Sequence, residues 1–389
     1  MRAPRKMHFF RDGCVADFCS GKIGIPYILY ISSVLVLLWS QVGLTQDTFQ
    51  ILRDQGQGYA AVTRDRVLEF PRDHAAHPEF RVEWWYLTAN MIDDKGRDWG
   101  LQWTLFRQAL SPVADTEGWD ANQLWMAHAA ITTPEKHLFE QRFARGGIGQ
   151  AGVSETETDG IFNAWLDDWQ WRSSGASMFP SQLVFTLETT RVEMRLESSS
   201  DWVLHGDRGY SQKSAQGQAS YYYSQPNIKV NAVVIYEGET IELSGSAWLD
   251  REWSSQPLAQ NQSGWDWFSL HLDDGNSLML YRLRHDDGNH WLSGTWIDTL
   301  GQSRHLTSTD IDLTERSTRS IRIGEQHSVE LPLEWDIELP ALKRKFRIKP
   351  LYDQQWMGTS FSYWEGVILV EDADGQSAGK GYMELTGYD

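Results

Sequence analysis

Short runs of strand-forming residues recur along most of the chain, and no long stretch between them shows the 3.6-residue period of an amphipathic helix. In 101–105, for example, Leu, Trp and Leu alternate with polar residues, as in a strand that has one face in a core. Similar runs return about every 10 to 15 residues, separated by Gly, Asp, Ser or Pro. This pattern predicts an all-β protein built as an antiparallel barrel or sandwich.

With 389 residues, the chain is too long for a single small domain. A weak internal repeat indicates two related domains. In both 85–107 and 267–284 an aromatic pair opens a strand, a turn of the Asp-Asp-Gly type reverses it, and the returning strand ends in arginine. Hairpins converge on such patterns, so the repeat supports two domains without proving them. We expect the first domain over 47–257 and the second over 258–389.

The first 46 residues differ from the rest. Basic residues precede an apolar run over 25–39, which is the arrangement of a secretory signal peptide. The small residues of a cleavage site are poorly represented at 42–44, so an uncleaved N-terminal membrane anchor is the alternative, although the run is short for a full span. Either alternative predicts an exported body, periplasmic or anchored to the inner membrane facing the periplasm. It would contact the membrane only through this segment.

Several classes of function are disfavoured. Both cysteines precede the apolar run, so the exported body has no disulfide, thiol nucleophile or Cys-based metal site. The net charge of −18 repels phosphate backbones, and we expect no nucleic-acid partner. His74 and His77 are three residues apart, but Pro78 and the lack of helical periodicity argue against a metal site. Gly-rich phosphate loops and nucleophile elbows are absent from the sequence, and we predict no cofactor.

Asp250 and Glu252 stand among the four tryptophans of 247–267. If this segment is extended, Asp250 and Glu252 face the same way, roughly 7 Å apart, and Arg251 faces the other way. An acid pressed against apolar rings tends to keep its proton and can serve as a general acid, while the second acid can activate a water. The alternative is that the tryptophans are core and the charges form a buried ion pair. Our candidate catalytic residues are Asp250 and Glu252.

Aromatic residues around these acids are our candidates for the ligand-binding wall. One face of the strand after Gly264 carries Trp265, Trp267, Ser269 and His271. If it lines a barrel interior, it forms an aromatic pocket with polar handles; otherwise it fills the gap between the two domains. The candidate ligand-binding residues are Trp84, Trp85, Tyr222, Trp248, Trp253, Trp265 and Trp267.

Motifs occur in order over nearly the whole body. They are Glu83-Trp-Trp-Tyr86, Gly209-Tyr, Tyr222-Tyr-Ser224, Gly245-Ser-Ala-Trp-Leu-Asp-Arg-Glu-Trp253, Gly264-Trp-Asp-Trp-Phe268, Tyr363-Trp-Glu-Gly366 and Gly381-Tyr-Met-Glu-Leu-Thr-Gly-Tyr388. In these motifs the chain resembles the AttH-like and carotenoid 1,2-hydratase (CrtC-like) family of exported or membrane-associated proteins. The resemblance implies two lipocalin-like antiparallel β-barrels in tandem.

The resemblance also implies alternatives for function. The hydratase branch adds water across a terminal double bond of an acyclic carotenoid, and by resemblance Asp250 is the proton donor. Hydratases carry a Tyr-His-Asp-His-Asn-Trp run where this chain has Trp248-Leu-Asp-Arg-Glu-Trp253, so the acid and last tryptophan remain and the histidines are missing. The AttH-like branch, often encoded beside an ABC exporter and described as a predicted hydrolase, fits this run better.

We therefore expect a protein that binds a hydrophobic or lipid-like small molecule, as a hydratase-like enzyme or a hydrolase. A non-enzymatic ligand carrier, or an accessory protein with an ABC transporter as partner, is the alternative. A third is a carbohydrate-active enzyme, since glycosidases use paired acids and tryptophan platforms suit sugar rings.

Overall fold

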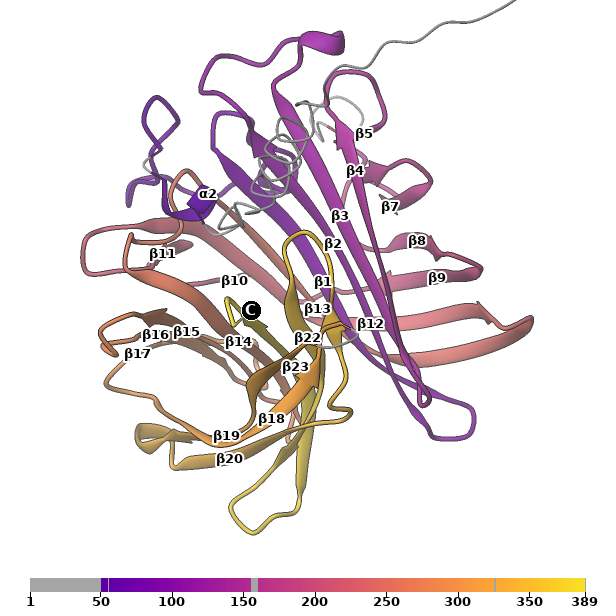
Figure 1. Cartoon of the computed structure of the whole chain (residues 1–389), viewed down its shortest axis with the longest axis vertical. Helices are drawn as coiled ribbons and strands as arrows, with labels where there is room; N and C mark the ends of the chain where they lie inside the picture. Colours follow the sequence, from indigo (N-terminus) through magenta and orange to yellow (C-terminus); the bar gives the residue numbers. More distant parts are fainter. Residues whose placement is uncertain (1–49, 55, 155–159, 325–326, 389) are drawn as a thin grey trace, which may run out of the picture. The chain divides into compact units, whose positions relative to one another are not determined.

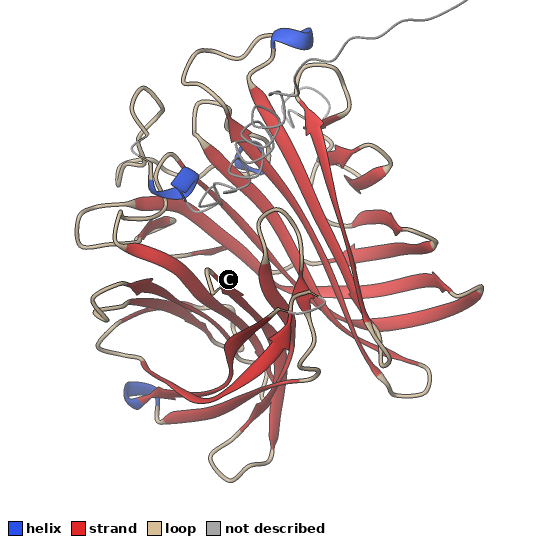
Figure 2. Cartoon of the chain, viewed as in Figure 1, coloured by secondary structure: helices blue, strands red, loops and turns tan. Residues whose placement is uncertain are grey.

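The computed structural model describes residues 50–54, 56–154, 160–324 and 327–388, all within one compact unit, Thr48–Asp389. The predicted signal peptide or anchor over 1–46 lies outside this range. Strands dominate the unit (Figures 1 and 2). Its helical pieces are short: α2 (Gln50–Arg53), η1 (Arg72–His74), η2 (Gly118–Asp120) and η3 (Pro340–Leu342). Within the described residues, no helix has the length and hydropathy needed to cross a membrane. The all-β prediction is confirmed.

The first sheet has 13 strands in the order β4-β3-β2-β1-β13-β12-β9-β8-β7-β6-β5, with β10 and β11 paired to β12. Its strands are β1 (Val82–Asp93), β2 (Asp98–Ala109), β3 (Gln123–Thr132), β4 (His137–Arg145), β5 (Ala151–Val153), β6 (Asn163–Leu166), β7 (Trp169–Ser173), β8 (Ser181–Leu187), β9 (Thr190–Glu197), β10 (Val203–Leu204), β11 (Tyr210–Gln212), β12 (Ala219–Tyr236) and β13 (Glu239–Ser254).

The second sheet has 10 strands in the order β17-β16-β15-β14-β23-β22-β20-β19-β18, with β21 paired to β22. Its strands are β14 (Gln262–Leu272), β15 (Ser277–His285), β16 (Trp291–Ile297), β17 (Ser303–Thr307), β18 (Asp312–Arg322), β19 (Ser328–Leu339), β20 (Arg344–Pro350), β21 (Trp356–Met357), β22 (Tyr363–Glu371) and β23 (Ser377–Thr386). The chain leaves the first sheet at Ser254 and enters the second at Gln262.

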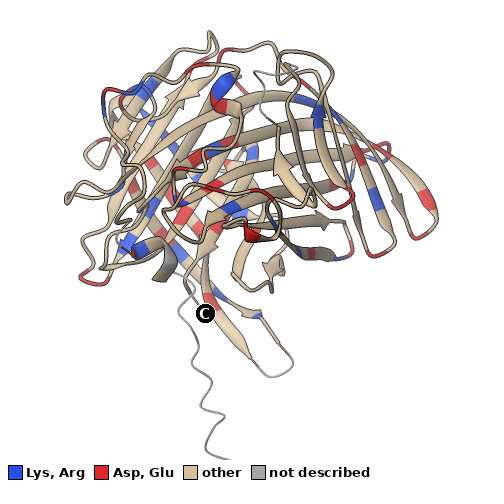
Figure 3. Cartoon of the chain, turned by 90° about the horizontal axis from the view of Figure 1, so that it is seen from above, with Lys and Arg blue, Asp and Glu red and all other residues tan. Residues whose placement is uncertain are grey.

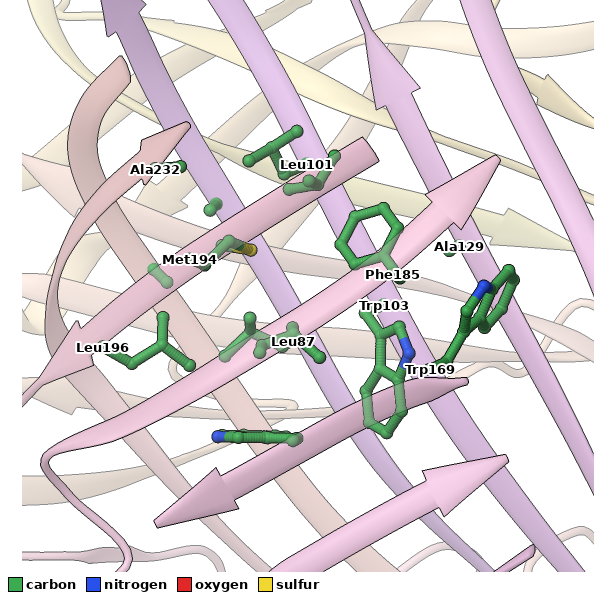
Figure 4. Close-up of a cluster of buried hydrophobic side chains, with 14 of the residues drawn as sticks. Leu87, Leu101, Trp103, Ala129, Trp169, Phe185, Met194, Leu196 and Ala232 are labelled. Atoms are coloured by element: carbon green, nitrogen blue, oxygen red, sulfur yellow. The ribbon is translucent and has the colours of Figure 1, made fainter. Parts of the chain in front are cut away.

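The two sheets curl into a barrel and a half-barrel, each around its own apolar core (Figure 1). Alternation along the strands builds these cores: in β2 the inward residues include Leu101 and Trp103, both essentially unexposed. Figure 4 shows them gathered with Leu87, Phe185 and Met194 from other strands of the first sheet. Charged residues of both signs are interspersed along the strands (Figure 3), and much of the buried charge is paired.

A third apolar cluster joins the outer faces of the two sheets, and we call this layer the seam. Its buried members are Tyr86, Val203, Tyr222, Trp248, Leu258, Trp267, Met279, Tyr281, Leu283, Ile297, Val367 and Tyr382. The sheets approach closely at Gly100, where a Cβ would lie 2.5 Å from the Tyr382 hydroxyl. That hydroxyl donates to the Leu101 carbonyl at 3.3 Å. Glycine is therefore needed at this crossing, and the crossing holds the seam in place.

Candidate functional site

A cavity of about 330 Å³ opens at the seam, with walls from both sheets. Most of its wall is apolar, as in sites for hydrophobic ligands. The apolar side chains include Trp84, Phe106, Leu124 and Met126 from the first sheet and Trp265, Trp267, Leu283 and Phe361 from the second part of the chain. The polar residues that contribute atoms to the wall are Glu83, Tyr86, Arg107, Gln108, Lys213, Tyr222, Asp250, Glu252, Tyr281, Ser360, Tyr363 and Glu384.

Strand β13 carries Asp250 and Glu252 into this cavity. It lies between β1 and β12, so that Asp250 is opposite Tyr86 on one side and Ser224 on the other. Both carboxylates line the cavity, as the expected alternation requires. Arg251 points to the other face, where its Nη2 lies 2.7 Å from Glu83 Oε1. The predicted same-side acids and opposite-side arginine are therefore present in the structure.

Asp250 is a buried acid held by three donors. Its Oδ2 accepts from the Tyr222 hydroxyl at 2.6 Å, and its Oδ1 accepts from Trp248 Nε1 at 2.7 Å and from the Ser224 hydroxyl. Burial, with a smaller contribution from the charge of Glu252, outweighs these hydrogen bonds and raises the pKa of Asp250 to about 7. Near neutral pH, a large fraction of Asp250 therefore carries a proton beside an apolar cavity.

Glu252 is in a different environment. Lys213 Nζ lies 2.7 Å from its Oε1, and the Ser220 hydroxyl donates to the same oxygen. The ammonium also lies 4.2 Å from the ring centre of Tyr281, an attractive cation–π distance. Burial opposes the charge on Lys213, but the neighbouring Glu252 outweighs it and raises the pKa of Lys213. The cavity thus holds a protonatable acid and an ion-paired carboxylate side by side.

Two further acids come from the second sheet and were not among our candidates. Glu365 and Glu384 are direct cross-strand partners on β22 and β23. Trp265 Nε1 donates to Glu384 at 2.8 Å, and the Tyr86 hydroxyl donates to Glu365 at 2.6 Å. Burial and neighbouring carboxylates raise the pKa of Glu384 to about 7 and that of Glu365 well above its usual range. Each is the single acid in a motif that carries the family resemblance. That position is the sequence signal that could have identified Glu365 and Glu384 as candidates.

Four of the seven candidate aromatic residues line the cavity: Trp84, Tyr222, Trp265 and Trp267. Trp248 lies behind it and reaches Asp250 through its indole nitrogen. The structure does not bring Trp85 or Trp253 to the cavity, because alternation turns them to the other face of the first sheet. Trp85 lies under the Arg251 guanidinium at 3.9 Å, and Trp253 stacks on His77 with ring centres 4.0 Å apart.

The face of β14 that carries Trp265 and Trp267 points into the seam and not into a barrel interior. Phe268 and Leu270 on the opposite face fill the core of the second sheet. Of the two alternatives for this face, filling the gap between the sheets is therefore the one observed. The gap is incompletely filled, and the remaining space is the cavity.

The histidine pair near the first sheet is engaged by protein groups. His77 Nδ1 lies 2.6 Å from Glu83 Oε1, and His74 Nδ1 lies 2.7 Å from the Tyr223 hydroxyl. Across the described part of the chain, no group of three or more His, Cys, Asp or Glu side chains is arranged to hold a metal ion.

Comparison with known proteins identifies the family of this chain. The sequence profile of the AttH-like family matches residues 61–388. The chain belongs to the AttH-like family. A solved AttH-type protein from Nitrosomonas europaea is 34% identical, with a TM-score of 0.74 over 85% of this chain and 100% of that one. The resemblance read from the sequence motifs is thus confirmed. No protein of curated function matches the sequence.

More distant members of the fold include two further solved structures. Kievitone hydratase from Nectria haematococca has 13% identity to the present chain and a TM-score of 0.62. The match covers 87% of the present chain and 98% of the hydratase. CghA, solved with Sch210972, has 10% identity and a TM-score of 0.51, over 88% and 98%. At these identities the likeness concerns the fold alone. It confirms the predicted tandem lipocalin-like architecture.

Proposed function

We propose that this AttH-like protein binds a hydrophobic molecule in the seam cavity and adds water to one of its carbon–carbon double bonds. The observation that carries the proposal is Asp250, an acid that holds a proton near neutral pH and lines an apolar cavity. Protonation of an alkene needs such a donor with water largely excluded. The neighbouring Glu252 supplies the second group that hydration requires.

The first step transfers the Asp250 proton to one alkene carbon. The π electron pair forms the new C–H bond, the O–H bond of the acid breaks, and the other carbon becomes a cation. Aromatic π faces attract cations, and Trp84 and Trp267 are both in the cavity wall. The carboxylates in the wall add negative potential where the cation forms.

The second step adds water to that cation. A water oxygen forms the C–O bond while one of its protons passes to the carboxylate of Glu252, whose Oε1 lies 2.7 Å from Lys213 Nζ. The cycle closes when a proton returns to Asp250 and Glu252 releases the one it took. Glu384 on the facing wall offers a second position for the same water.

Fold and family support this type of reaction. A hydratase is among the proteins with the same fold, and the motif around Asp250 resembles that of the hydratase branch with its acid retained. The flanking histidines of that branch are replaced here by Leu249 and Arg251, which both point away from the cavity. The hydrogen bonds to Asp250 come instead from β12 and from Trp248.

Oxygen-18-labelled water tests the proposal. The purified protein is incubated with kievitone and, separately, with a lycopene-type carotenoid, and products are analysed by mass spectrometry. We expect one labelled hydroxyl in the wild-type product, none with Asp250→Asn and a reduced yield with Glu252→Gln. Glu242→Gln, at an exposed position of β13, serves as the control and should match wild type. Equal ligand retention without labelled product in wild type and Asp250→Asn would contradict hydration of these compounds.

A ligand carrier is the second candidate, favoured by the predominance of apolar side chains in the cavity wall. We propose that in this case the protein retains a hydrophobic molecule for an ABC transporter. We also propose export, because basic residues precede the apolar run over 25–39. Cell fractionation and N-terminal sequencing of the mature protein test export: a periplasmic protein starting near residue 47 indicates cleavage, and an intact, membrane-bound one indicates an anchor.

A further inference from the structure

A buried histidine lies behind Asp250, on the side away from the cavity, and links it to the second sheet. His205 follows β10 and is 1% exposed. Its Nε2 lies 2.6 Å from the Ser224 hydroxyl, which itself contacts Asp250 Oδ1. Its Nδ1 lies 2.8 Å from the hydroxyl of Thr295 on β16. Neither His205 nor Thr295 lines the cavity, so no bound ligand would touch them.

We infer that Thr295, His205 and Ser224 form a proton relay that reloads Asp250 from the second sheet while the cavity is occupied. The inference rests on the proposed function, because that reaction leaves Asp250 without its proton. His205 and Thr295 are positioning residues in this scheme, since they act on the substrate only through Asp250.

Every group in the relay can both donate and accept a proton. With Asp250 ionised, the Thr295 hydroxyl donates to His205 Nδ1, His205 Nε2 donates to Ser224, and Ser224 donates to Asp250. With Asp250 protonated, each bond runs in the opposite direction. The two states differ by one proton shift in each hydrogen bond, and the Thr295 oxygen, which gives its proton to His205, regains one from solvent. Neutral imidazole suits this role because one nitrogen carries hydrogen while the other accepts it.

The outer end of the relay, Thr295, is 2% exposed and has an exposed residue beside it on the next strand. Thr295 is the direct cross-strand partner of His305 on β17, and His305 is exposed at the edge strand of the second sheet. Side chains of direct partners project from the same face of a sheet. Burial, together with the positive charge of Lys213 and the nearby His305, holds the pKa of His205 well below its usual value. His205 therefore passes a proton on and does not retain it.

The relay answers a need that the cavity itself creates. A hydrophobic ligand among these apolar walls displaces the water that would otherwise exchange with Asp250. After proton transfer the buried carboxylate is unfavourable, and its raised pKa drives it to recover a proton. A route through β12 and β16 supplies that proton without opening the cavity.

Hydrogen–deuterium exchange of the Asp250 carboxylic acid, followed by infrared spectroscopy, tests the relay without any substrate. The band is assigned by its loss in Asp250→Asn. The full-length protein is transferred into deuterated buffer saturated with benzene, which occupies apolar cavities. We expect exchange to be slower by on the order of 10² in His205→Gln and Thr295→Val, because a relaying group contributes about that factor. Added imidazole should partly restore the rate in His205→Gln.

A buried threonine and a part-buried histidine provide matched controls. Thr104→Val removes a buried hydroxyl on β2, and His271→Gln replaces a histidine whose Nε2 contacts the Pro226 carbonyl. Both should exchange at the wild-type rate. Wild-type rates in His205→Gln and Thr295→Val, or equal slowing in the controls, would overturn the relay. Slow exchange together with no hydration product would retain the relay and reject only the proposed reaction.

Discussion

Glu365 and Glu384 are directly opposite each other on β22 and β23, with Glu384 in the cavity wall and Glu365 buried behind it. Burial, and then the repulsion between neighbouring carboxylates, raises the pKa values of both residues, so the pair retains a proton well above the usual pKa of glutamate. We predict that Glu384→Gln stabilises the fold by up to about 1 kcal/mol at pH 8 and has a smaller effect at pH 5. Urea unfolding at the two pH values measures this, and a variant less stable than wild type at pH 8 would refute the repulsion.

Asp250 makes stability depend on pH in a defined direction. Its pKa is above that of an unfolded chain, so the folded state binds the proton more tightly, and stability falls as pH rises from 3.8 through about 7. The loss linked to this group is on the order of 4 kcal/mol over that interval. We predict a smaller fall in Asp250→Asn, measured by unfolding from pH 4 to pH 8. Parallel curves for the two proteins would show that Asp250 does not titrate near neutrality.

The buried charge network under the cavity is a stability element. Glu83 contacts Arg251 and Arg107 at 2.7 and 2.9 Å, and all three side chains are buried. Its removal leaves two guanidinium groups unpaired, and we predict that Glu83→Gln destabilises the protein by about 3–5 kcal/mol. Glu193→Gln removes the partner of Arg191 in an exposed pair and should cost about 0–1 kcal/mol. Similar losses in both variants would contradict a special role for the buried network.

The two sheets are in close contact at Gly100. A Cβ there would lie 2.5 Å from the Tyr382 hydroxyl and 2.6 Å from Val367 Cγ2, so Gly100→Ala must push the sheets apart. We expect a loss of about 1–3 kcal/mol and weaker binding of a hydrophobic probe in the cavity. At Gly175 a Cβ would meet nothing within 4 Å, and Gly175→Ala is the control. Equal stability of both variants would argue against tight packing at the crossing.

The strand pattern allowed the all-β class and the common face of Asp250 and Glu252 to be predicted, because alternation follows directly from the extended backbone. The tandem lipocalin-like architecture was predicted from the family motifs. It could not show which face of a strand meets a barrel core and which meets the seam. Trp85 and Trp253 looked equivalent to Trp84 in the sequence, yet they face the other way. Only the pairing of the sheets decides this.

Register limits sequence reasoning in a second way. Glu365 and Glu384 are 19 positions apart in the sequence and become neighbours only through the pairing of β22 with β23. His205 likewise reaches Asp250 through Ser224 on β12 and reaches Thr295 across the seam. No local pattern encodes these contacts, although the motifs of the family marked Glu365, Glu384 and Ser224.

The proposed reaction depends on Asp250 being a carboxylic acid at neutral pH inside the seam cavity. Infrared titration of the wild-type protein, with Asp250→Asn to identify the carboxylic-acid band, measures this directly and needs no substrate. We predict that the band persists at pH 6 and reaches half its intensity near pH 7, as the burial of Asp250 requires. A band that has already disappeared at pH 5 would show that Asp250 is an ordinary ionised aspartate. It would contradict the proposed role of Asp250 as proton donor.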